Sequence, residues 1–257
     1  MGPDSATPGE TAADPVRVVV DALDHAMAER LQGVDALSVA YSGGLDSSIV
    51  ALLGARRATT RLHVVGFPNS HDVNAAQRGA DLLGLPLSVR TLRPADLAAA
   101  QSRWADDLAD AGPTARSVAL GTLMALEAST EHLVGMGQGA DEWFFGYAHF
   151  LRLNPDAALR RSLDDAALLV EHEWPRAQRI ARAMGHEVFS PFLDPAVIAS
   201  ARAAGVPVHL AGGERKALLR RAARRLGLPA ELCGRPKKAF QYGSGIDAAL
   251  RRGGVRP

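Results

Sequence analysis

The sequence predicts an α/β fold: a doubly wound parallel sheet followed by a mainly helical C-terminal part. Through the first 150 residues, short apolar segments alternate with segments of helical periodicity, which is typical of strands joined by crossover helices. Glycine-rich loops follow two of the apolar segments, as expected where a strand passes into a helix. Beyond them nearly every segment has helical periodicity, and no repeat recurs at a fixed period.

The composition predicts one folded domain preceded by a tail. Hydrophobic residues make up 47% of the 257 residues and charged residues 22%, an ordinary globular balance. We expect a flexible tail over residues 1–14 and a single domain over 15–257. The one cysteine, Cys233, excludes an internal disulfide. Because no apolar stretch is long enough to span a bilayer and no secretory signal is present, a cytoplasmic protein is expected.

The expected elements follow in order. The first helix is expected over 15–32, because Asp14 followed by Pro15 is a typical helix start. Four apolar segments are the expected strands: 36–41, 62–67, 87–91 and 131–136. Helical periodicity predicts helices between them, at 47–57, 74–83, 95–111 and 117–129. After Gly146 the prediction is almost wholly helical, with breaks at Pro175, Pro191, Pro195, Pro207 and Pro229.

The loop after the first expected strand has the character of an anion site. This phosphate loop is Ser42-Gly43-Gly44-Leu45-Asp46-Ser47-Ser48. Its two glycines allow close approach of phosphate oxygens, its three serine hydroxyls can donate, and the N–H groups of the following helix converge there. Asp46 would repel phosphate unless a cation such as Mg²⁺ lay between them. The alternative is an ordinary glycine turn capped by Asp46.

Four motifs, in order, resemble those of one family. The SGGxDS loop resembles the PP-loop of the N-type ATP pyrophosphatases. Three more segments resemble parts of the synthetase domain of asparagine synthetase: Gly137-Gln138-Gly139-Ala140-Asp141-Glu142-Trp143-Phe144-Phe145-Gly146-Tyr147 its GEGADELFGGY, Val188–Asp194 its EVRVPFLD, and Arg235-Pro236-Lys237 its RPK. Gly243-Ser244-Gly245 also resembles the GSG of β-lactam synthetases. The motifs span about residues 36 to 245.

The resemblance implies an ATP-dependent amide synthetase that releases AMP and pyrophosphate. Such an enzyme uses ATP and Mg²⁺ to adenylate a small carboxylic acid, then transfers the acyl group to ammonia or an amine. It implies an adenine nucleotide alpha hydrolase-like fold, with 15–150 as the nucleotide-binding α/β part and 151–257 as the helical part. By resemblance, Asp46 and Asp141 ligate Mg²⁺, and Lys237 neutralises charge on the phosphates and the intermediate. Each carboxylate could instead be a cap, and Lys237 a surface lysine.

The resemblance also implies where the nucleotide lies. The backbone of Val65, Gly66 and Phe67, at the end of the second strand, is expected to contact adenine, with plain core packing as the alternative. Three further residues are expected to contact ATP: Arg116, Gly137 and Lys216. For Lys216 a helix-surface role is the alternative.

Two departures from the family concern the nitrogen donor. The family's glutaminase cysteine follows Met1, where this sequence has Gly2. Nitrogen is therefore expected from free ammonium, from a separate glutaminase, or from an amine carried by a substrate. Gln138 stands where asparagine synthetases have glutamate, and glutamine can orient a group but cannot act as a general base. We expect Glu173 to act as the catalytic base instead, and Glu171 to matter far less.

A third departure is Phe145, which replaces the first glycine of the family's paired GG. We expect its ring to fill space near the acceptor site. Together these departures mean that the acid need not be aspartate.

Two other functions stay open. A PP-loop enzyme could instead modify a tRNA or a sulfur-carrier partner, with residues 214–257 as its nucleic-acid contact. That segment carries twelve Arg or Lys against three Asp or Glu, a net charge of about +9, but it lacks interleaved aromatic residues. Its arginines could equally form a solvated helix face, so nucleic acid is the less favoured partner. The third function is a degenerate domain that binds nucleotide as a sensor. No membrane partner is expected, and an oligomer is left open.

Overall fold

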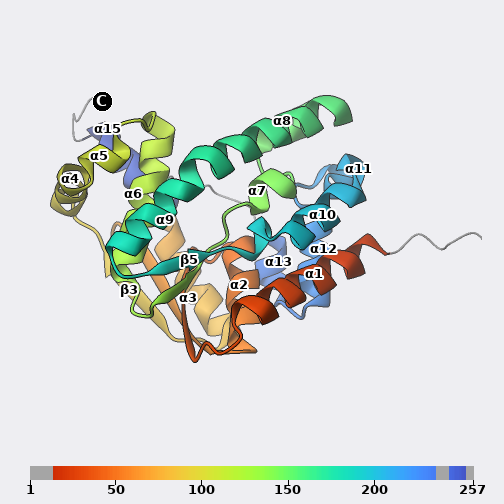
Figure 1. The fold of residues 1–257 in the computed structure, drawn as a ribbon, viewed down its shortest axis with the longest axis horizontal. Coiled ribbons are helices and arrows are strands. Elements are labelled where there is room, and N and C mark those ends of the chain that lie inside the picture. The colour runs from red at the N-terminus through yellow and green to blue at the C-terminus, as the bar shows by residue number, and fades with distance from the viewer. Residues whose placement is uncertain (1–13, 236–242, 253–257) are drawn as a thin grey trace, which may run out of the picture.

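A single parallel sheet lies at the centre of the protein, with helices on both of its faces (Figure 1). The computed structural model describes residues 14–235 and 243–252. Five strands pair in the order β3-β2-β1-β4-β5, every neighbouring pair parallel. Their bounds are β1 Ala36–Ala40, β2 Thr59–Gly66, β3 Leu87–Thr91, β4 Leu133–Gly135 and β5 Glu187–Phe189.

Helices make up most of the remainder. In the first part of the chain they are α1 Pro15–Arg30, α2 Leu45–Ala55, α3 His71–Leu83, α4 Pro94–Arg103, α5 Ala105–Leu108, α6 Pro113–Ala128 and α7 Ala140–Trp143. The second part contains η1 Ala148–Arg152, α8 Pro155–Leu168, η2 Leu169–Glu173, α9 Trp174–Ala183, η3 Pro191–Leu193, α10 Pro195–Ala204, α11 Val206–His209, η4 Ala211–Gly213, α12 Ala217–Arg225, α13 Ala230–Gly234 and α15 Ile246–Arg252. Asp14 accepts the Val16 N–H at 3.0 Å, so α1 begins where the Asp-Pro pair predicts.

Two apolar cores cover the two faces of the sheet. On one face α2 and α3 pack against the strands, and α1, α10 and α12 close the same core. On the other face α6 and α9 pack against the strands, with α4 and α15 outside them. Because β1 and β4 are covered on both sides, their sequences are almost continuously apolar rather than alternating.

The order of the strands reverses between β1 and β4. The chain runs outward from β1 through β2 to β3, then returns to place β4 on the opposite side of β1. In doubly wound sheets, ligands bind beyond the carboxyl ends of the strands at such a point. Here the loops that leave these two ends are the phosphate loop and the loop that begins at Gly137.

The predicted α/β doubly wound parallel sheet is confirmed, and two local expectations are wrong. Strand β5 lies where only helices were expected, because its residues show no strand pattern of their own. The expected break at Pro175 does not occur, since α8, η2 and α9 follow one another without a gap. The η2 segment is a π-helical turn, whose wider path relieves the clash of a proline ring with the preceding turn.

Two other expectations can be compared with the structure only in part. Of the expected tail, residues 1–14, only Asp14 is among the described residues. Within the described ranges, no helix combines the length and the apolar character that a bilayer crossing requires.

Candidate active site

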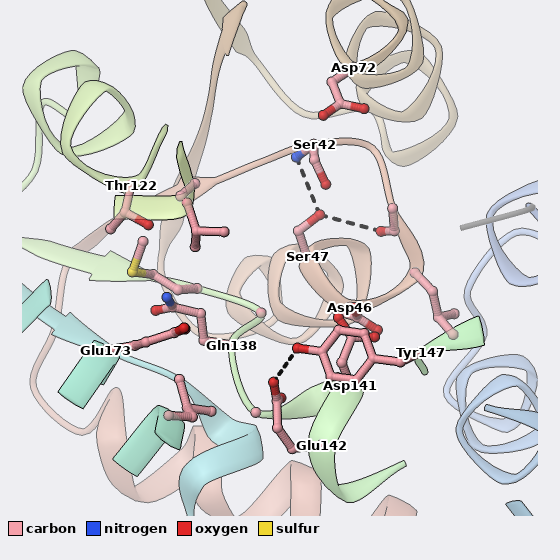
Figure 2. A pocket seen from close by; sticks show the side chains of 18 of the residues that line it. Ser42, Asp46, Ser47, Asp72, Thr122, Gln138, Asp141, Glu142, Tyr147 and Glu173 are labelled. Carbon is pink, nitrogen blue, oxygen red and sulfur yellow. Dashed lines mark hydrogen bonds between the residues drawn. The ribbon is translucent and has the colours of Figure 1, made fainter. Parts of the chain in front are cut away.

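A cavity of about 430 Å³ lies beyond the carboxyl ends of β1 and β4. That volume is typical of small-molecule sites. The phosphate loop, the loop after β4, η2 and the start of α12 all contribute to its lining. Many of the residues selected from the sequence line it: Ser42, Gly44, Asp46, Ser47, Val65, Gly137, Gln138, Asp141, Glu173 and Lys216. Figure 2 shows Ser42 and Ser47 of the phosphate loop above Asp46 and Asp141, with Gln138 and Glu173 to one side.

The phosphate loop is held open toward the cavity. Gly43 has φ 68°, and a Cβ at this position would overlap the carbonyl of Ala75 in α3, so only glycine fits. The Ser42 N–H donates to Ser47 Oγ at 3.4 Å, and the Ser47 hydroxyl donates to the Gly44 carbonyl at 3.3 Å. No side chain caps the N-terminus of α2, which starts after Gly44. Its first N–H groups are therefore available to an anion.

One ammonium group joins the two carboxylates that the resemblance assigns to magnesium. Lys216 Nζ lies 2.6 Å from each carboxylate oxygen of Asp46 and 2.7 Å from Oδ1 of Asp141. The Lys216 side chain is only 3% exposed. Burial lowers the pKa of Lys216, and the neighbouring Asp46 charge opposes that shift. These three residues, Asp46, Asp141 and Lys216, are named the charge cluster below.

The backbone around the charge cluster is unusual at two positions. Lys216 has φ 59°, a left-handed conformation that costs a non-glycine residue about 1 kcal/mol. Gly146 lies against the cluster, and a Cβ there would overlap both Asp141 Oδ1 and Lys216 Cε. Non-glycine residues held in this conformation concentrate at functional sites, which agrees with a role for Lys216 in the cavity.

The charge cluster fits a magnesium ion that is shared with a polyphosphate. Asp46 and Asp141 point their oxygens at one common position, and carboxylate oxygens are the ligands that Mg²⁺ prefers. The part of the chain that the structure describes holds no group of three or more His, Cys, Asp or Glu side chains able to bind a metal alone. The two carboxylates would therefore need phosphate oxygens and water to complete the coordination.

Gln138 and Glu173 lie near each other on one side of the cavity (Figure 2). The Ser190 hydroxyl donates to the Gln138 backbone carbonyl at 2.6 Å. The side-chain oxygen Gln138 Oε1 is buried, and no described residue donates to it. Burial raises the pKa of Glu173, whereas Glu171 is exposed on the same turn. Glu173 thus lines the cavity and Glu171 does not, while the catalytic role expected for Glu173 stays a prediction.

Sequence reasoning missed Glu142 as an acidic residue of the cavity lining. Its side chain accepts a 2.5 Å hydrogen bond from the Tyr147 hydroxyl, and both residues line the cavity. Glu142 is 6% exposed. Burial raises the pKa of both groups. The motif Gly137–Tyr147 contains both residues, so the sequence pointed to this segment. Only the folded loop shows which of its side chains face the cavity.

Several residues expected at the nucleotide do not line the cavity. Ser48 is fully buried, and its hydroxyl shares a 3.1 Å hydrogen bond with Tyr41. Gly66 ends β2, where a Cβ would crowd neighbouring side chains. The Phe67 N–H donates to the Ser244 carbonyl at 3.0 Å, and the Phe67 ring packs against the core beneath α6. Of the three residues expected at adenine, the structure places Val65 alone in the lining.

Two more expected residues lie apart from the cavity or outside the described residues. Arg116 donates to the Leu108 carbonyl at 3.4 Å and does not line the cavity. Lys237 lies outside the described residues. Arg235, two positions earlier in the same motif, lines the cavity and donates to the Gly43 carbonyl at 2.6 Å. That motif therefore reaches the phosphate loop.

The expectation for Phe145 is wrong. Its ring packs against Phe150 and His209, each with centroids 5.0 Å apart, in a small core outside the cavity lining. Phe145 itself has φ 57°, a conformation that favours glycine. The Phe145 ring therefore does not narrow the cavity. A glycine would adopt this backbone conformation without strain.

The chain matches the asparagine synthase family over residues 19–176 and 154–256. It is 28% identical over 265 residues to a protein named putative glutamine-hydrolyzing asparagine synthetase 1 from Methanocaldococcus jannaschii, with 87% of this chain and 48% of that protein covered. It is 29% identical over 206 residues to glutamine-hydrolyzing asparagine synthetase from Triphysaria versicolor, with 72% and 34% covered. The chain thus spans about half the length of these relatives, or less.

Two solved structures resemble the fold at low sequence identity. NMN synthetase from Francisella tularensis has a TM-score of 0.47 and 12% identity, with 93% of this chain and 87% of that chain covered. NH3-dependent NAD synthetase from Campylobacter jejuni has a TM-score of 0.34 and 17% identity, with 89% and 100% covered. The assignment rests on the sequence match, which includes both loops of the cavity. The chain belongs to the asparagine synthase family.

Proposed function

We propose that this chain is an ATP-dependent amide synthetase that forms AMP and pyrophosphate. It adenylates a small carboxylic acid and transfers the acyl group to ammonia or an amine. The charge cluster carries the proposal, because two carboxylates from the loops after β1 and β4 meet beside an open helix N-terminus. An anion and its divalent counter-ion have complementary partners there, as activation by ATP requires.

Each part of the cavity then has a task. The N–H groups of the phosphate loop bind the phosphates, and Arg235 holds that loop through the Gly43 carbonyl. Asp46 and Asp141 hold Mg²⁺, which when bound neutralises charge on the departing pyrophosphate. Lys216 adds positive charge, as Lys237 does by family resemblance, and Val65 lies at the strand end proposed for adenine.

The second half of the reaction needs a base. Glu173 lines the cavity, and burial raises its pKa, which makes its carboxylate a stronger base than an exposed glutamate. Gln138 orients a reacting group. Free ammonium, a substrate amine and a separate glutaminase subunit all stay within the proposal as sources of nitrogen. A cytoplasmic location also stays a prediction.

The tRNA-modifying alternative receives less support. In that alternative, the basic C-terminal segment, residues 214–257, contacts the nucleic acid. Several arginines of this segment instead bind groups of this chain. Arg220 donates to the Cys233 carbonyl, Arg225 pairs with Asp14 at 2.6 Å, and Arg251 pairs with Asp247 at 2.7 Å. Less of the charge is therefore free for phosphates than the sequence suggests.

The test is release of AMP and pyrophosphate from Mg-ATP with a panel of carboxylic acids, each with and without ammonium. We expect one acid class to stimulate release, and Asp46→Asn and Asp141→Asn to lower it about a hundredfold or more. Asp164→Asn, at an exposed aspartate of α8, is the control. Release that is insensitive to both substitutions would refute the proposal.

A further inference from the structure

We propose that the exposed face of α8 and η2 is the contact between two copies of this chain, related by a two-fold axis. Each copy contributes the apolar stripe, which consists of Leu159, Leu163, Ala167 and Val170, and the two helices run antiparallel. The pairing does not depend on the proposed synthetase, because the stripe lies outside the charge cluster.

The exposed apolar side chains of the protein are concentrated in one short segment. Among the described residues, seven large apolar residues are exposed, and six of them lie within residues 151–170. These six are Leu151, Leu153, Leu159, Leu163, Leu168 and Val170, each 37–54% exposed. The seventh, Val89, lies on the edge strand β3. Single exposed apolar residues are common on protein surfaces, whereas a cluster marks an interaction site.

Within the described chain, other elements cover α8 on one side only. Its buried residues Ala158, Ser162 and Ala166 face the protein, and the Ser162 hydroxyl donates to the Glu142 carbonyl at 2.7 Å. Figure 1 shows α8 at the outer edge of the molecule, with α7 and α11 below it. The residues of the apolar stripe are four, four and three positions apart, so they share a helix face, and that face is exposed. A helix of a soluble protein normally packs such a stripe against its own core.

The charges beside the stripe are those of a surface that can pair with itself. Exposed residues of both signs flank it, including Arg152 and Arg160 as well as Asp156 and Glu171. This mixture does not favour an anionic membrane, which requires a helix face rich in Lys and Arg, or a partner of one strong charge. Neither Arg160 nor Glu171 has an ion-pair partner in the described part of the chain. They are eleven positions apart, which is about three helical turns, so they lie on the same flank of the stripe.

A two-fold axis near the middle of the stripe makes these charges complementary. Two antiparallel copies place Arg160 of each copy opposite Glu171 of the other, because the two residues lie at equal distances on either side of the axis. The same arrangement sets Leu163 of one copy against Ala167 of the other. Each contact occurs twice, and the result is an apolar centre with ion pairs at its rim, as in stable interfaces.

The proposed contact also borders the mouth of the cavity. Leu168, the most exposed of the six apolar residues at 54%, lines the cavity as well. Arg161 and Asp165 of α8 contribute to the same lining. A second copy seated on the stripe therefore covers Leu168 and lies beside the opening of the cavity.

The experiment measures the mass of the full chain by sedimentation equilibrium at about 1–100 µM, without nucleotide or substrate. We expect a monomer–dimer equilibrium in this range. Leu163→Glu should raise the dissociation constant at least about a hundredfold, because the new charge is buried twice at the centre of the contact. Val89→Glu, at the exposed apolar residue outside the cluster, is the matched control and should leave the dissociation constant unchanged.

An exchange of charges tests the two-fold arrangement. Arg160→Glu and Glu171→Arg each place like charges opposite one another, so each should raise the dissociation constant about tenfold. The double variant, Arg160→Glu with Glu171→Arg, restores opposite charges and should return the constant to within about threefold of the unmodified protein. Only pairing with a second copy produces this rescue.

A chain that stays monomeric at about 100 µM would overturn the proposal. A dimer that Leu163→Glu does not weaken would also overturn it, because the contact would then lie elsewhere on the surface. Weakening by both single charge variants without rescue in the double variant would refute the antiparallel two-fold arrangement. Circular dichroism checks that each variant is folded, and the charge variants decide alone if Leu163→Glu is not, because Arg160 and Glu171 are exposed.

Discussion

Replacing Lys216 by methionine tests the charge cluster most directly. Lys216→Met keeps the length of the side chain and removes the ammonium that contacts both carboxylates. Because Asp46 and Asp141 each touch the same nitrogen, their nearest oxygens lie no more than about 5 Å apart, and two charges at that distance repel by about 3 kcal/mol at an effective dielectric constant of 20. That figure agrees with the low end of the 3–5 kcal/mol lost when a buried pair loses one partner. The low end applies because the two aspartates are 20% and 19% exposed.

The measurement is thermal unfolding followed by circular dichroism, in EDTA and in millimolar MgCl2, without nucleotide. A loss of about 3 kcal/mol corresponds to a fall in Tm of about 6–12 °C for a domain of this size. We expect Mg²⁺ to restore part of the loss in Lys216→Met, since the ion replaces the missing charge, and to change the unmodified protein little. Arg221→Met, at an exposed position of the same helix, should stay within about 0.5 kcal/mol.

The reasoning fails if Lys216→Met is as stable as the unmodified protein in EDTA. Such a result would mean that the carboxylates do not need the ammonium. Equal rescue of both proteins by Mg²⁺ would show that lysine and metal do not share one position.

Three further predictions concern the surroundings of the site. Gly146→Ala places a methyl group against the charge cluster, so acid-dependent pyrophosphate exchange should fall at least tenfold, while Gly234→Ala, which meets no atom within 4 Å, should not alter it. Burial lowers the pKa of His209 to about 4, below the value of 6.5 in the unfolded chain, so the unfolded chain takes up a proton first as the pH falls. The stability that this histidine contributes is therefore complete above pH 6.5, and the free energy of unfolding in urea should fall by about 2 kcal/mol from pH 7 to pH 5. The variant His209→Gln should lack this loss. Phe145→Ala should lower the free energy of unfolding by about 3–5 kcal/mol through lost packing. Phe145→Gly should lower it by about 1 kcal/mol less, because glycine adopts φ 57° without strain. If the alanine variant is the more stable of the two, the left-handed conformation does not strain this position.

The local sequence was sufficient to predict the architecture and the two loops of the site. Strand periodicity, the paired glycines of the phosphate loop and the Asp14-Pro15 helix start each depend on neighbouring residues, so the pattern predicts the conformation. Strand β5 was not predictable in this way, because its three residues form a strand through pairing with β4 and not through any pattern of their own. The predicted helix break at Pro175 was wrong for a similar reason, since the helix continues through a π-helical turn that no local sequence pattern predicts.

By itself the sequence determined the family, the fold and the position of Asp46 and Asp141 at neighbouring strand ends. Only the tertiary structure decided what lies between them. Lys216 is 170 positions from Asp46, and it reaches the cluster because α12 packs against α2 and because Gly146 leaves room beside Asp141. Ion pairs between distant segments depend on packing geometry, and no local pattern in a sequence records that geometry.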